Sequence, residues 1–472
     1  INYAEGFPNT QAADITFARQ YMEGKRPEGE SSINRELSFL ATGNYSYNNR
    51  YLVDLTYRIG ASSLYGTDNR WAPGWSVGLG WNIHNEKFMA KNGIVDQLKL
   101  RASAGLTGNQ NFTTSYAVGT YNYYTDYNYN GFTGSYLERL PNSLLKWEQK
   151  LDYNLGLDVS SGRFKIKADL YDSYTENMLT NVSVSRSTGF TQVKDNLGKV
   201  RNKGYELSAS VNIWQSKNGF LNIYGSIAAN ENIIVELSES MKAFNALQEK
   251  EAANKGNNEP VLMYKDGMSM TAIWAVKSLG IDPMNGQEIY LKKDGTRTYV
   301  YDPLDLQVVG DTRPTAIGQF GFTSEYKGFG ISTTFRYLFG GQMYNKTLVE
   351  RVENINVFYN VDKRVLTGRW QTPGQNAMYK RLGTYTTSDD PTARQEMTRA
   401  TSRFVQDRNE LTLGSASVYY EFPKRFIDRL KVSRMKFSLY MNDIFTISSV
   451  EAERGLSYPF ARTVSGSLSI TF

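Results

Sequence analysis

Segments in which polar and apolar side chains alternate recur along this chain, and this period of two constrains its fold more than any other feature. Residues 50–59 show the pattern clearly. The positions of one parity are Tyr51, Val53, Leu55, Tyr57 and Ile59, and those of the other parity include Asp54, Thr56 and Arg58. Because successive side chains of a strand point to opposite faces, each segment predicts a strand with one apolar and one polar face.

Length and aromatic content favour a transmembrane β-barrel over a soluble β-sandwich. The 472 residues include 33 Tyr, 23 Phe and 7 Trp, yet only 40% of them are hydrophobic. A run of about 18 apolar residues, which a membrane-spanning helix needs, is absent from the sequence. A barrel in lipid needs an apolar outer face, a closed backbone ladder and aromatic girdles. On composition alone, a large soluble all-β protein stays open as the alternative.

Charge, cysteine and histidine content argue against several other classes. The net charge of +6 is scattered along the chain, so no nucleic-acid surface is predicted. Zero cysteines argue against disulfides and thiolate metal sites. The single histidine, His84, lies near the end of a predicted strand, where it is poorly placed for a Ser-His-acid group. We therefore expect no catalytic residues and no enzymatic activity.

About thirteen segments are predicted as barrel strands. They are 36–47, 50–61, 73–84, 96–107, 149–160, 163–175, 199–213, 219–235, 313–326, 328–340, 410–422, 432–445 and 464–472. Short connections alternate with longer ones, and the longest connections are 108–146, 176–198, 236–312 and 341–409. Bacterial outer-membrane barrels have short periplasmic turns and long extracellular loops, so we expect the long connections to be extracellular. Thr271–Leu279 and Glu288–Leu291 fit a hairpin above the membrane rather than two barrel strands.

An odd number of strands predicts that this chain is part of a larger barrel. Single-chain bacterial barrels have an even number of strands, and an open sheet edge in lipid costs several kcal/mol per unpaired backbone group. The chain opens at Ile1 without a signal peptide, which an exported protein requires. We therefore expect the N-terminal portion to be missing here or to lie on another chain.

Several motifs, in order along nearly the whole chain, resemble the SusC family of TonB-dependent outer-membrane transporters. They are the segments 50–58, 60–63, 68–71, 76–81, 98–101, 108–110, 145–148, 201–206, 279–283, 310–314, 403–404, 442–445 and 467–472. The terminal Ser467-Leu-Ser-Ile-Thr-Phe472 is one example, and Arg201-Asn-Lys-Gly-Tyr-Glu206 is another. Such an ordered set is very unlikely to arise by chance.

The resemblance implies a barrel of about 22 strands whose lumen holds a plug domain. This chain would supply about strands 10–22, and the plug, the TonB-contacting segment and the first strands would lie outside it. The implied partners are the N-terminal plug and barrel remainder, a SusD-like lipoprotein lid, the TonB complex and outer-membrane lipid. The implied location is the outer membrane of a Gram-negative bacterium. No cofactor is implied.

The aromatic residues of segment 115–136 are candidates for contact with substrate or lid. They are Tyr116, Tyr121, Tyr123, Tyr124, Tyr127, Tyr129, Phe132 and Tyr136. Aromatic rings stack on sugars or pack on peptide side chains, and tyrosine adds a hydroxyl at low entropic cost. An aromatic rim on strands extended above the membrane is the alternative. Tyr65 and Trp71, at another loop tip, are expected to belong to the interfacial girdle.

The charged residues at polar positions of the predicted strands are expected to face the lumen or the plug. They are Asp54, Arg58, Lys99, Arg101, Lys165, Lys167, Asp169, Glu206 and Arg336. Solvation of the interior or contact with the plug is favoured over direct substrate binding.

Two further sets of residues have assigned roles. Leu468, Ile470 and Phe472 are expected to face lipid, and the resemblance implies that this C-terminus serves in barrel assembly. Asp389-Asp390, or Asp302 with Asp305, supply oxygen ligands for Ca²⁺, but their spacing is not that of a binding loop, so no metal site is predicted.

The predicted function is import of oligosaccharides or oligopeptides that are too large for a passive pore. Aromatic loops suit glycans, while similar family members handle peptides, so both substrate classes stay open. A passive porin or adhesin, or an outer-membrane enzyme, are the alternatives. A plug would distinguish a transporter from a passive porin or adhesin. A catalytic cluster would instead indicate an enzyme.

Overall fold

A single antiparallel sheet of thirteen strands dominates the computed structural model. The structure describes residues 34–65, 69–89, 93–109, 119–129, 132–184, 186–190, 192–196, 198–355, 360–382, 385–386, 395–430, 432–451 and 462–472. The sheet consists of β1 (Glu36–Tyr47), β2 (Tyr51–Ser62), β3 (Trp71–Asn82), β4 (Gln97–Asn109), β7 (Glu148–Ser161), β8 (Phe164–Glu176), β11 (Gly198–Ser216), β12 (Gly219–Leu237), β17 (Ala316–Tyr326), β18 (Phe329–Tyr344), β21 (Val405–Glu421), β22 (Arg434–Ser448) and β23 (Val464–Thr471). The predicted strand count is confirmed, although β21 begins earlier than the predicted residue 410.

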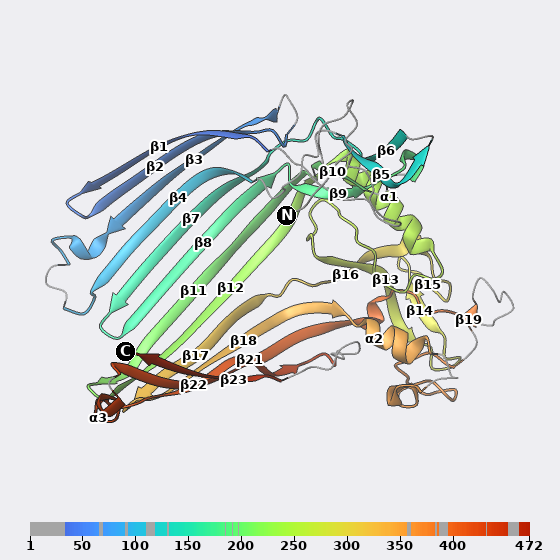
Figure 1. Cartoon of the computed structure of the whole chain (residues 1–472). Coiled ribbons are helices and arrows are strands. Elements are labelled where there is room, and N and C mark those ends of the chain that lie inside the picture. The colour runs from blue at the N-terminus through green and yellow to red at the C-terminus, as the bar shows by residue number, and fades with distance from the viewer. Residues whose placement is uncertain are drawn as a thin grey trace.

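The sheet curls into a trough, which we call the wall (Figure 1). Its strands follow one another in chain order, so every neighbour in the wall is also the next wall strand in sequence. The short connections gather at one end, together with the C-terminus, and the long ones gather at the other (Figure 1). The observed connections thus follow the predicted alternation, with a short-turn end and a long-loop end.

Two tight turns at the short-turn end illustrate why these sequences form hairpins. Asn48 and Asn49 join β1 to β2 with φ of 49° and 52°, and Lys327 and Gly328 join β17 to β18 with φ of 49° and 85°. Two-residue hairpin turns of type I′ need positive φ at both central residues, which asparagine and glycine adopt most readily. The local sequence therefore fixes the strand register at these turns.

The two faces of the wall differ in polarity along most of its length. The outer face presents exposed apolar side chains, among them Phe164, Ile166, Leu170, Tyr205, Leu207, Phe320, Phe339, Leu468 and Ile470. The rings of Phe320 and Phe335 on adjacent strands stack with centroids 5.1 Å apart. An apolar face this extensive is the outer surface that a lipid bilayer requires.

The apolar outer face ends before the strands do. Three ion pairs lie on the outer face of β8, β11 and β12, nearer the long-loop end. They join Lys199 to Glu176, Arg201 to Asp172 and Lys203 to Glu231. Charged groups are costly at the bilayer centre. These strands therefore project beyond the apolar belt on the long-loop side.

Glycine in the wall makes room for tyrosine from a neighbouring strand. A Cβ added at Gly204 would lie 2.6 Å from the hydroxyl of Tyr171, and one added at Gly330 would lie 2.0 Å from the ring of Tyr419. The same arrangement joins Gly318 to Tyr337 and Gly321 to Tyr224. Tyrosine thus covers strand positions that lack a side chain, which explains part of the chain's high content of both residues.

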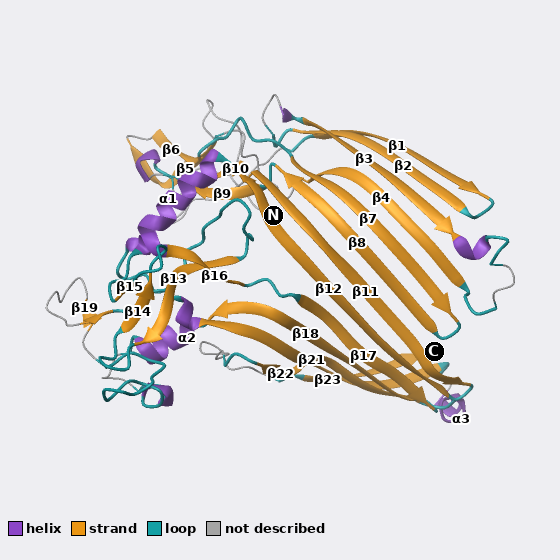
Figure 2. Ribbon diagram, turned by 180° about the vertical axis from the view of Figure 1, so that it is seen from behind, coloured by secondary structure: helices purple, strands orange, loops and turns teal. Residues whose placement is uncertain are grey.

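The long connections carry further elements. They are the hairpins β5 (Thr120–Tyr129) with β6 (Phe132–Arg139) and β9 (Leu179–Ser183) with β10 (Gln192–Asn196), the helices α1 (Glu239–Ala253) and α2 (Lys346–Leu348), and the strands β13 (Ala272–Ile281), β14 (Glu288–Leu291), β15 (Arg297–Thr298), β16 (Leu306–Asp311), β19 (Tyr385–Thr386) and β20 (Gln395–Glu396). At the short-turn end lies α3 (Lys424–Ile427) (Figure 2). One π-helical turn, Val349–Glu353, and single 3-10 turns at Ile83–Asn85, Arg186–Thr188, Pro303–Asp305, Lys363–Val365, Ser402–Phe404 and Asp428–Leu430 complete the set.

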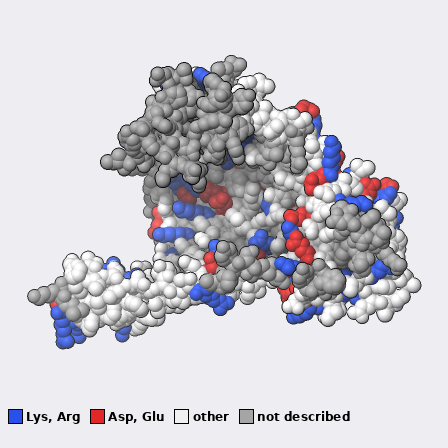
Figure 3. All heavy atoms as spheres, turned by 45° about the vertical axis from the view of Figure 1, so that its right-hand side comes forward, with Lys and Arg blue, Asp and Glu red and all other residues white. Residues whose placement is uncertain are grey.

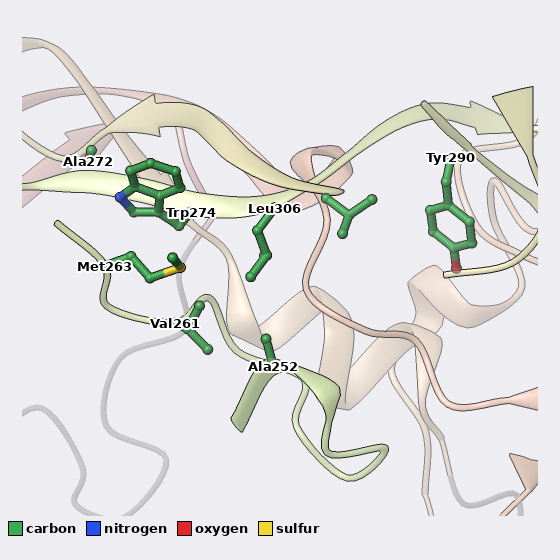
Figure 4. Close-up of a cluster of buried hydrophobic side chains, with 8 residues drawn as sticks. Ala252, Val261, Met263, Ala272, Trp274, Tyr290 and Leu306 are labelled. Carbon is green, nitrogen blue, oxygen red and sulfur yellow. The ribbon is translucent and has the colours of Figure 1, made fainter. Parts of the chain in front are cut away.

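We call the described parts of 239–311 and 346–404 the loop subdomain. Strands β13 and β14 pair in a separate four-stranded sheet, which confirms that they form a hairpin outside the wall. One buried cluster packs side chains of α1, β13, β14 and β16 around Trp274 (Figure 4). A second cluster, around Val349 and Phe404, joins the two ends of the connection between β18 and β21. Among the described residues, no helix is long and apolar enough to cross a membrane.

Two local expectations differ from the structure. Helix α1 was not expected, because its apolar residues give only a weak amphipathic pattern. The side chain of Tyr65 is 1% exposed and stacks on Trp147 with ring centroids 4.3 Å apart, so it is not part of an exposed girdle. Burial also raises the pKa of Tyr65. Trp71, by contrast, is half exposed on β3.

Candidate functional site

Charged and polar side chains recur in rows across the inner face of the wall. The strand register aligns Lys99, Asp158, Lys167, Ser208, Ser226, Gln319, Arg336, Thr412 and Thr446 on nine successive strands. We call this the lower row. Two residues along each strand, toward the long-loop end, the upper row contains Arg101, Gly156, Asp169, Glu206, Ala228, Ile317, Leu338, Glu410 and Ser448. Cationic side chains predominate in the lower row and carboxylates in the upper row.

Arg101 links three strands within the upper part of this face. Its Nε lies 2.9 Å from Asp158 Oδ2, and its Nη2 lies 3.0 Å from Asp169 Oδ1. The guanidinium crosses Gly156 on β7, where an added Cβ would lie 2.6 Å from Arg101 Cζ. Gly156 therefore leaves the space that lets one arginine bind two carboxylates.

A second arginine is paired on the opposite side of the trough. Arg336 on β18 forms an ion pair with Asp443 on β22. Gly414 lies between them, and a Cβ at that position would lie 2.8 Å from Arg336 Nε. Arg101 and Arg336 are thus already paired with carboxylates of the wall itself.

A hollow of about 980 Å³ opens on this face. Of the nine predicted lumen residues, Lys167, Asp169, Glu206 and Arg336 line it. Asp443 and Glu410, which sequence reasoning missed, also line it. Cations and carboxylates lie close together in the hollow of the trough (Figure 3). Alternation along β21 and β22 was the available signal for the missed residues, but bulges on both strands hide it.

Glu206 and Lys167 differ from the two arginines. Within the described part of the chain, neither side chain makes a hydrogen bond or an ion pair, although both line the hollow. They lie on the adjacent strands β11 and β8. These two charges can therefore pair with a group that enters the trough.

The remaining predicted lumen residues lie on the same face but outside the hollow. Lys165 is one row nearer the short-turn end, and Lys99 and Arg101 lie on β4. Asp54 on β2 accepts a hydrogen bond of 2.5 Å from Asn44 Nδ2, and Arg58 lies further along the same strand. The structure brings all nine to one face. Their contact with a plug or a solute stays a prediction.

The predicted aromatic cluster is brought together by the hairpin of β5 and β6. Tyr121, Tyr123 and Tyr136 are 62%, 41% and 44% exposed. Tyr124, Tyr127, Tyr129 and Phe132 belong to the same two strands. Tyr116 lies outside the described residues. A role in substrate or lid contact stays a prediction.

The loop subdomain is held together by an ion cluster that sequence reasoning missed. Arg403 Nη2 lies 2.9 Å from Glu288 Oε2, and its Nη1 lies 2.5 Å from Glu353 Oε1. Glu288 and Glu353 have side chains that are 1% and 0% exposed. Thr401 and Thr398 each donate a hydrogen bond to one of these carboxylates. The motif Arg403-Phe404 was the only available sign of this cluster.

Burial and charge act in opposite directions on Glu288. Burial alone would raise the pKa of this carboxyl, but the Arg403 guanidinium outweighs it and holds the pKa below its ordinary value. The charged form is therefore the stable one, and it ties β14 to the segment before β21. This cluster joins two loop connections whose residues are more than a hundred positions apart in sequence.

The other predicted residues have simpler surroundings. The carboxylate of Asp302 accepts a hydrogen bond from Leu304 N, and that of Asp305 accepts one from Lys293 N, so both serve the local backbone. Asp389 and Asp390 lie outside the described residues. Within the described ranges there is no group of three residues that could hold a metal ion. Leu468 and Ile470 are exposed on β23, and Phe472 is 91% exposed.

Comparisons with known proteins give the chain a family. A sequence model described as TonB dependent receptor-like, beta-barrel matches residues 6–260. TonB-dependent receptor P39 of Formosa agariphila is 25% identical over 88% of this chain and 42% of its own length. TonB-dependent receptor SusC of Bacteroides thetaiotaomicron is 28% identical over 72% of this chain and 35% of its own length. The chain thus spans less than half the length of these curated relatives.

Solved structures share the fold. The structure of the RagAB peptide transporter covers 88% of this chain and 44% of its own, with a TM-score of 0.71 and 21% identity. RagAB in its 'open-open' state covers 95% of this chain and 47% of its own, with a TM-score of 0.72 and 20% identity. The family is one of outer-membrane β-barrel transporters rather than enzymes. With its thirteen-stranded wall and polar inner face, the chain belongs to the TonB-dependent receptor β-barrel family and is SusC-like.

Proposed function

We propose that this chain forms wall and loops of a TonB-dependent importer in the outer membrane of a Gram-negative bacterium. The observation that carries the proposal is the pair of rows on the inner face that hold charged and polar side chains, opposite an apolar outer face. Such a wall suits a hydrated passage through lipid. The remaining wall strands and a plug would be supplied by a portion of the protein beyond this chain, in line with the length of its relatives.

The proposed substrate is an oligosaccharide or an oligopeptide. The hollow of about 980 Å³ is large enough for a solute of this kind, and its lining carries charges of both signs. The exposed tyrosines of the β5–β6 hairpin suit stacking on either substrate class. RagAB, whose fold this chain shares, is named a peptide importer.

The proposed partners are a SusD-like lipoprotein at the long-loop end and TonB at the short-turn end. The loop subdomain, with its buried ion cluster, offers a rigid surface for a lid. Glu206 and Lys167 are proposed to bind complementary charges of a plug. Breaking those contacts would require the energy that TonB transmits.

An uptake experiment tests the proposal. Cells that carry the full-length protein would be given a radiolabelled peptide mixture or maltohexaose, with TonB present, with TonB deleted, or with an uncoupler. We expect accumulation that is lost without TonB or without the proton gradient. Uptake that persists in both conditions would identify a passive pore instead.

A matched pair of variants tests the role of the free charges. Glu206→Gln should weaken the contact with the plug and change TonB-dependent uptake by several-fold. Asp54→Asn, on the same face but away from the hollow, is the control and should leave uptake unchanged. Equal uptake by both variants would contradict a plug contact at Glu206.

A further inference from the structure

A short helix covers part of the outer face at the short-turn end. Helix α3 lies in the connection between β21 and β22 (Figure 2). Its residue Ile427 is buried in a cluster with Val432 and Met435. Met435 is directly opposite Ile470, one of the apolar residues of the outer face, so the two side chains share that face. Helix α3 therefore packs on the outer side of the wall, at the border of the apolar belt.

Aromatic rings continue from the belt onto this helix. Tyr420 is opposite Phe437, which in turn is opposite Leu468 on the outer face. The rings of Tyr420 and Phe422 meet edge to face with centroids 5.1 Å apart, and Phe422 stacks on Phe426 at 5.6 Å. Phe426 on α3 is 49% exposed. Because aromatic girdles mark the boundary between lipid and water in a barrel, α3 lies at that boundary.

The exposed surface of this helix and of the turn after it is basic. Lys424, Arg425 and Arg429 are exposed, and Asp428 is the only acidic residue of segment 423–430. Within the part of the chain that the structure describes, none of the three cations makes an ion pair or a side-chain hydrogen bond. These cations can therefore bind an anion from outside the chain.

Two neighbouring turns extend the basic surface. Glu421 N donates to Gly328 O at 2.7 Å, and Lys327 N donates to Asn218 O at 2.8 Å, so the three connections lie side by side. The turns add Lys217 and Lys327, which are exposed and have no ion-pair partner among the described residues. We call the five cations the basic rim. They are Lys217, Lys327, Lys424, Arg425 and Arg429.

The surroundings of the basic rim indicate what kind of anion it fits. Exposed rings adjoin its cations: Phe426 follows Arg425 on α3, and Lys327 Nζ lies 5.3 Å from the ring centroid of Tyr326. The carboxylate of Glu421 is already paired with Arg434 at 2.7 Å. A phospholipid offers a phosphate to the cations and acyl chains to the rings, whereas a soluble anion matches only the cations.

We infer that the basic rim binds the phosphate groups of anionic glycerophospholipids in the leaflet at the short-turn end, with Phe426 at the boundary of their acyl chains. Clustered cations at a membrane surface favour anionic lipids over neutral ones. Such binding would hold this end of the wall at a fixed depth in the bilayer. The inference goes beyond the proposed function, because it requires a lipid-facing wall and no substrate.

Lipid titration of the purified full-length protein, followed by native mass spectrometry, tests the inference. The probes are phosphatidylglycerol and phosphatidylcholine with the same acyl chains. The variant combines Lys424→Gln, Arg425→Gln and Arg429→Gln. We expect its affinity for phosphatidylglycerol to be at least about tenfold weaker than that of the wild type, with little change for phosphatidylcholine.

A second triple variant is the matched control. It combines Lys250→Gln, Lys277→Gln and Arg297→Gln, which removes the same charge from exposed positions of the loop subdomain. Its affinity for phosphatidylglycerol should stay within about twofold of the wild type. Equal losses in the two triple variants, or equal affinities of the wild type for the two lipids, would overturn the inference.

Two further measurements need no variant. Raising ammonium acetate from about 0.05 to 0.5 M should remove most of the preference for phosphatidylglycerol, and a preference that ignores ionic strength would contradict charge pairing. Displacement of phosphatidylglycerol by millimolar glycerol 3-phosphate would assign the basic rim to a soluble phosphate and would also overturn the inference. The outcome stands whether or not uptake depends on TonB.

Discussion

The wall and the loop subdomain of this protein are stabilised in different ways. The wall is one strand layer thick, and its large apolar side chains lie on the exposed outer face. Its ion pairs are partly exposed; the Arg101 side chain, for example, is 34% exposed. The loop subdomain has a buried apolar core around Trp274 and a buried arginine between two carboxylates.

This difference shows how two solvents act on one chain. Lipid supplies the apolar surroundings of the wall, so the wall needs backbone pairing more than a core. The loop subdomain faces water and has to bury its own apolar surface. A substitution or a change of pH should therefore affect one region much more than the other. The four predictions below test this contrast, from the largest expected effect to the smallest.

Removal of the buried cation should disrupt the loop subdomain alone. Arg403→Met leaves Glu288 and Glu353 buried without their partner, which should cost about 3–5 kcal/mol. We expect amide exchange of β13 and β14 to accelerate strongly, measured by mass spectrometry, while the wall strands stay protected. Lys242→Ala removes an exposed ion pair of α1 and should leave exchange unchanged. Loss of protection in the wall would show that the two regions do not fold separately.

A charge on the apolar outer face should destabilise the wall alone. Leu207→Arg places a guanidinium toward lipid and should cost about 2–4 kcal/mol. Lys203→Leu, on the same face of β11 but beyond the apolar belt, is the control and should have little effect. Denaturant unfolding of the full-length protein in lipid vesicles measures both variants. A cost for Lys203→Leu that matches Leu207→Arg would mean that the belt extends further than we describe.

A methyl group at Gly156 should disturb the inner face without affecting the outer one. The added Cβ would lie 2.6 Å from Arg101 Nη2 and Asp169 Oδ1, so Gly156→Ala should cost about 1–3 kcal/mol. Gly43→Ala, where no atom lies within 4 Å of the added Cβ, is the control. The same unfolding assay should separate the two variants, and equal stability would show that Arg101 moves aside freely.

Acid should open the loop subdomain before it affects the wall. The pKa of Glu288 is below its ordinary value in the folded state, so the stability that it contributes is present above the unfolded pKa of about 4.3 and falls as pH drops through the folded value. The slope is at most about 1.4 kcal/mol per pH unit for this group. Amide exchange of β14 across pH 7 to 3 measures the effect. A decline that already begins near pH 6 would contradict it.

The wall was predictable from sequence because its physics is local. Alternation places Phe164, Ile166 and Leu170 on one face, and an Asn48-Asn49 turn requires no distant contact. Thirteen strands and the arrangement of their connections followed from these signals. The shared face of the nine predicted charges followed from the same period of two.

The loop subdomain was much less predictable, because its contacts join distant segments. Arg403 pairs with Glu288 across 115 residues of sequence, and no local pattern marks either residue as buried. The alternation of β12 likewise does not reveal where this strand stops pairing with β17, after Ala228 opposite Ile317. Tyr65 was assigned to a girdle because its burial depends on the distant Trp147.

The two rows of the inner face have a consequence for the energy of a solute that travels along the trough. The lower row carries the cations Lys99, Lys167 and Arg336 with one carboxylate, Asp158. The upper row carries the carboxylates Asp169, Glu206 and Glu410 with one cation, Arg101. An ion of either sign therefore meets one row with an excess of opposite charge and one row with an excess of like charge, a few ångströms apart. A neutral molecule, or one whose opposite charges span both rows, passes from one row to the other with the smallest electrostatic barrier.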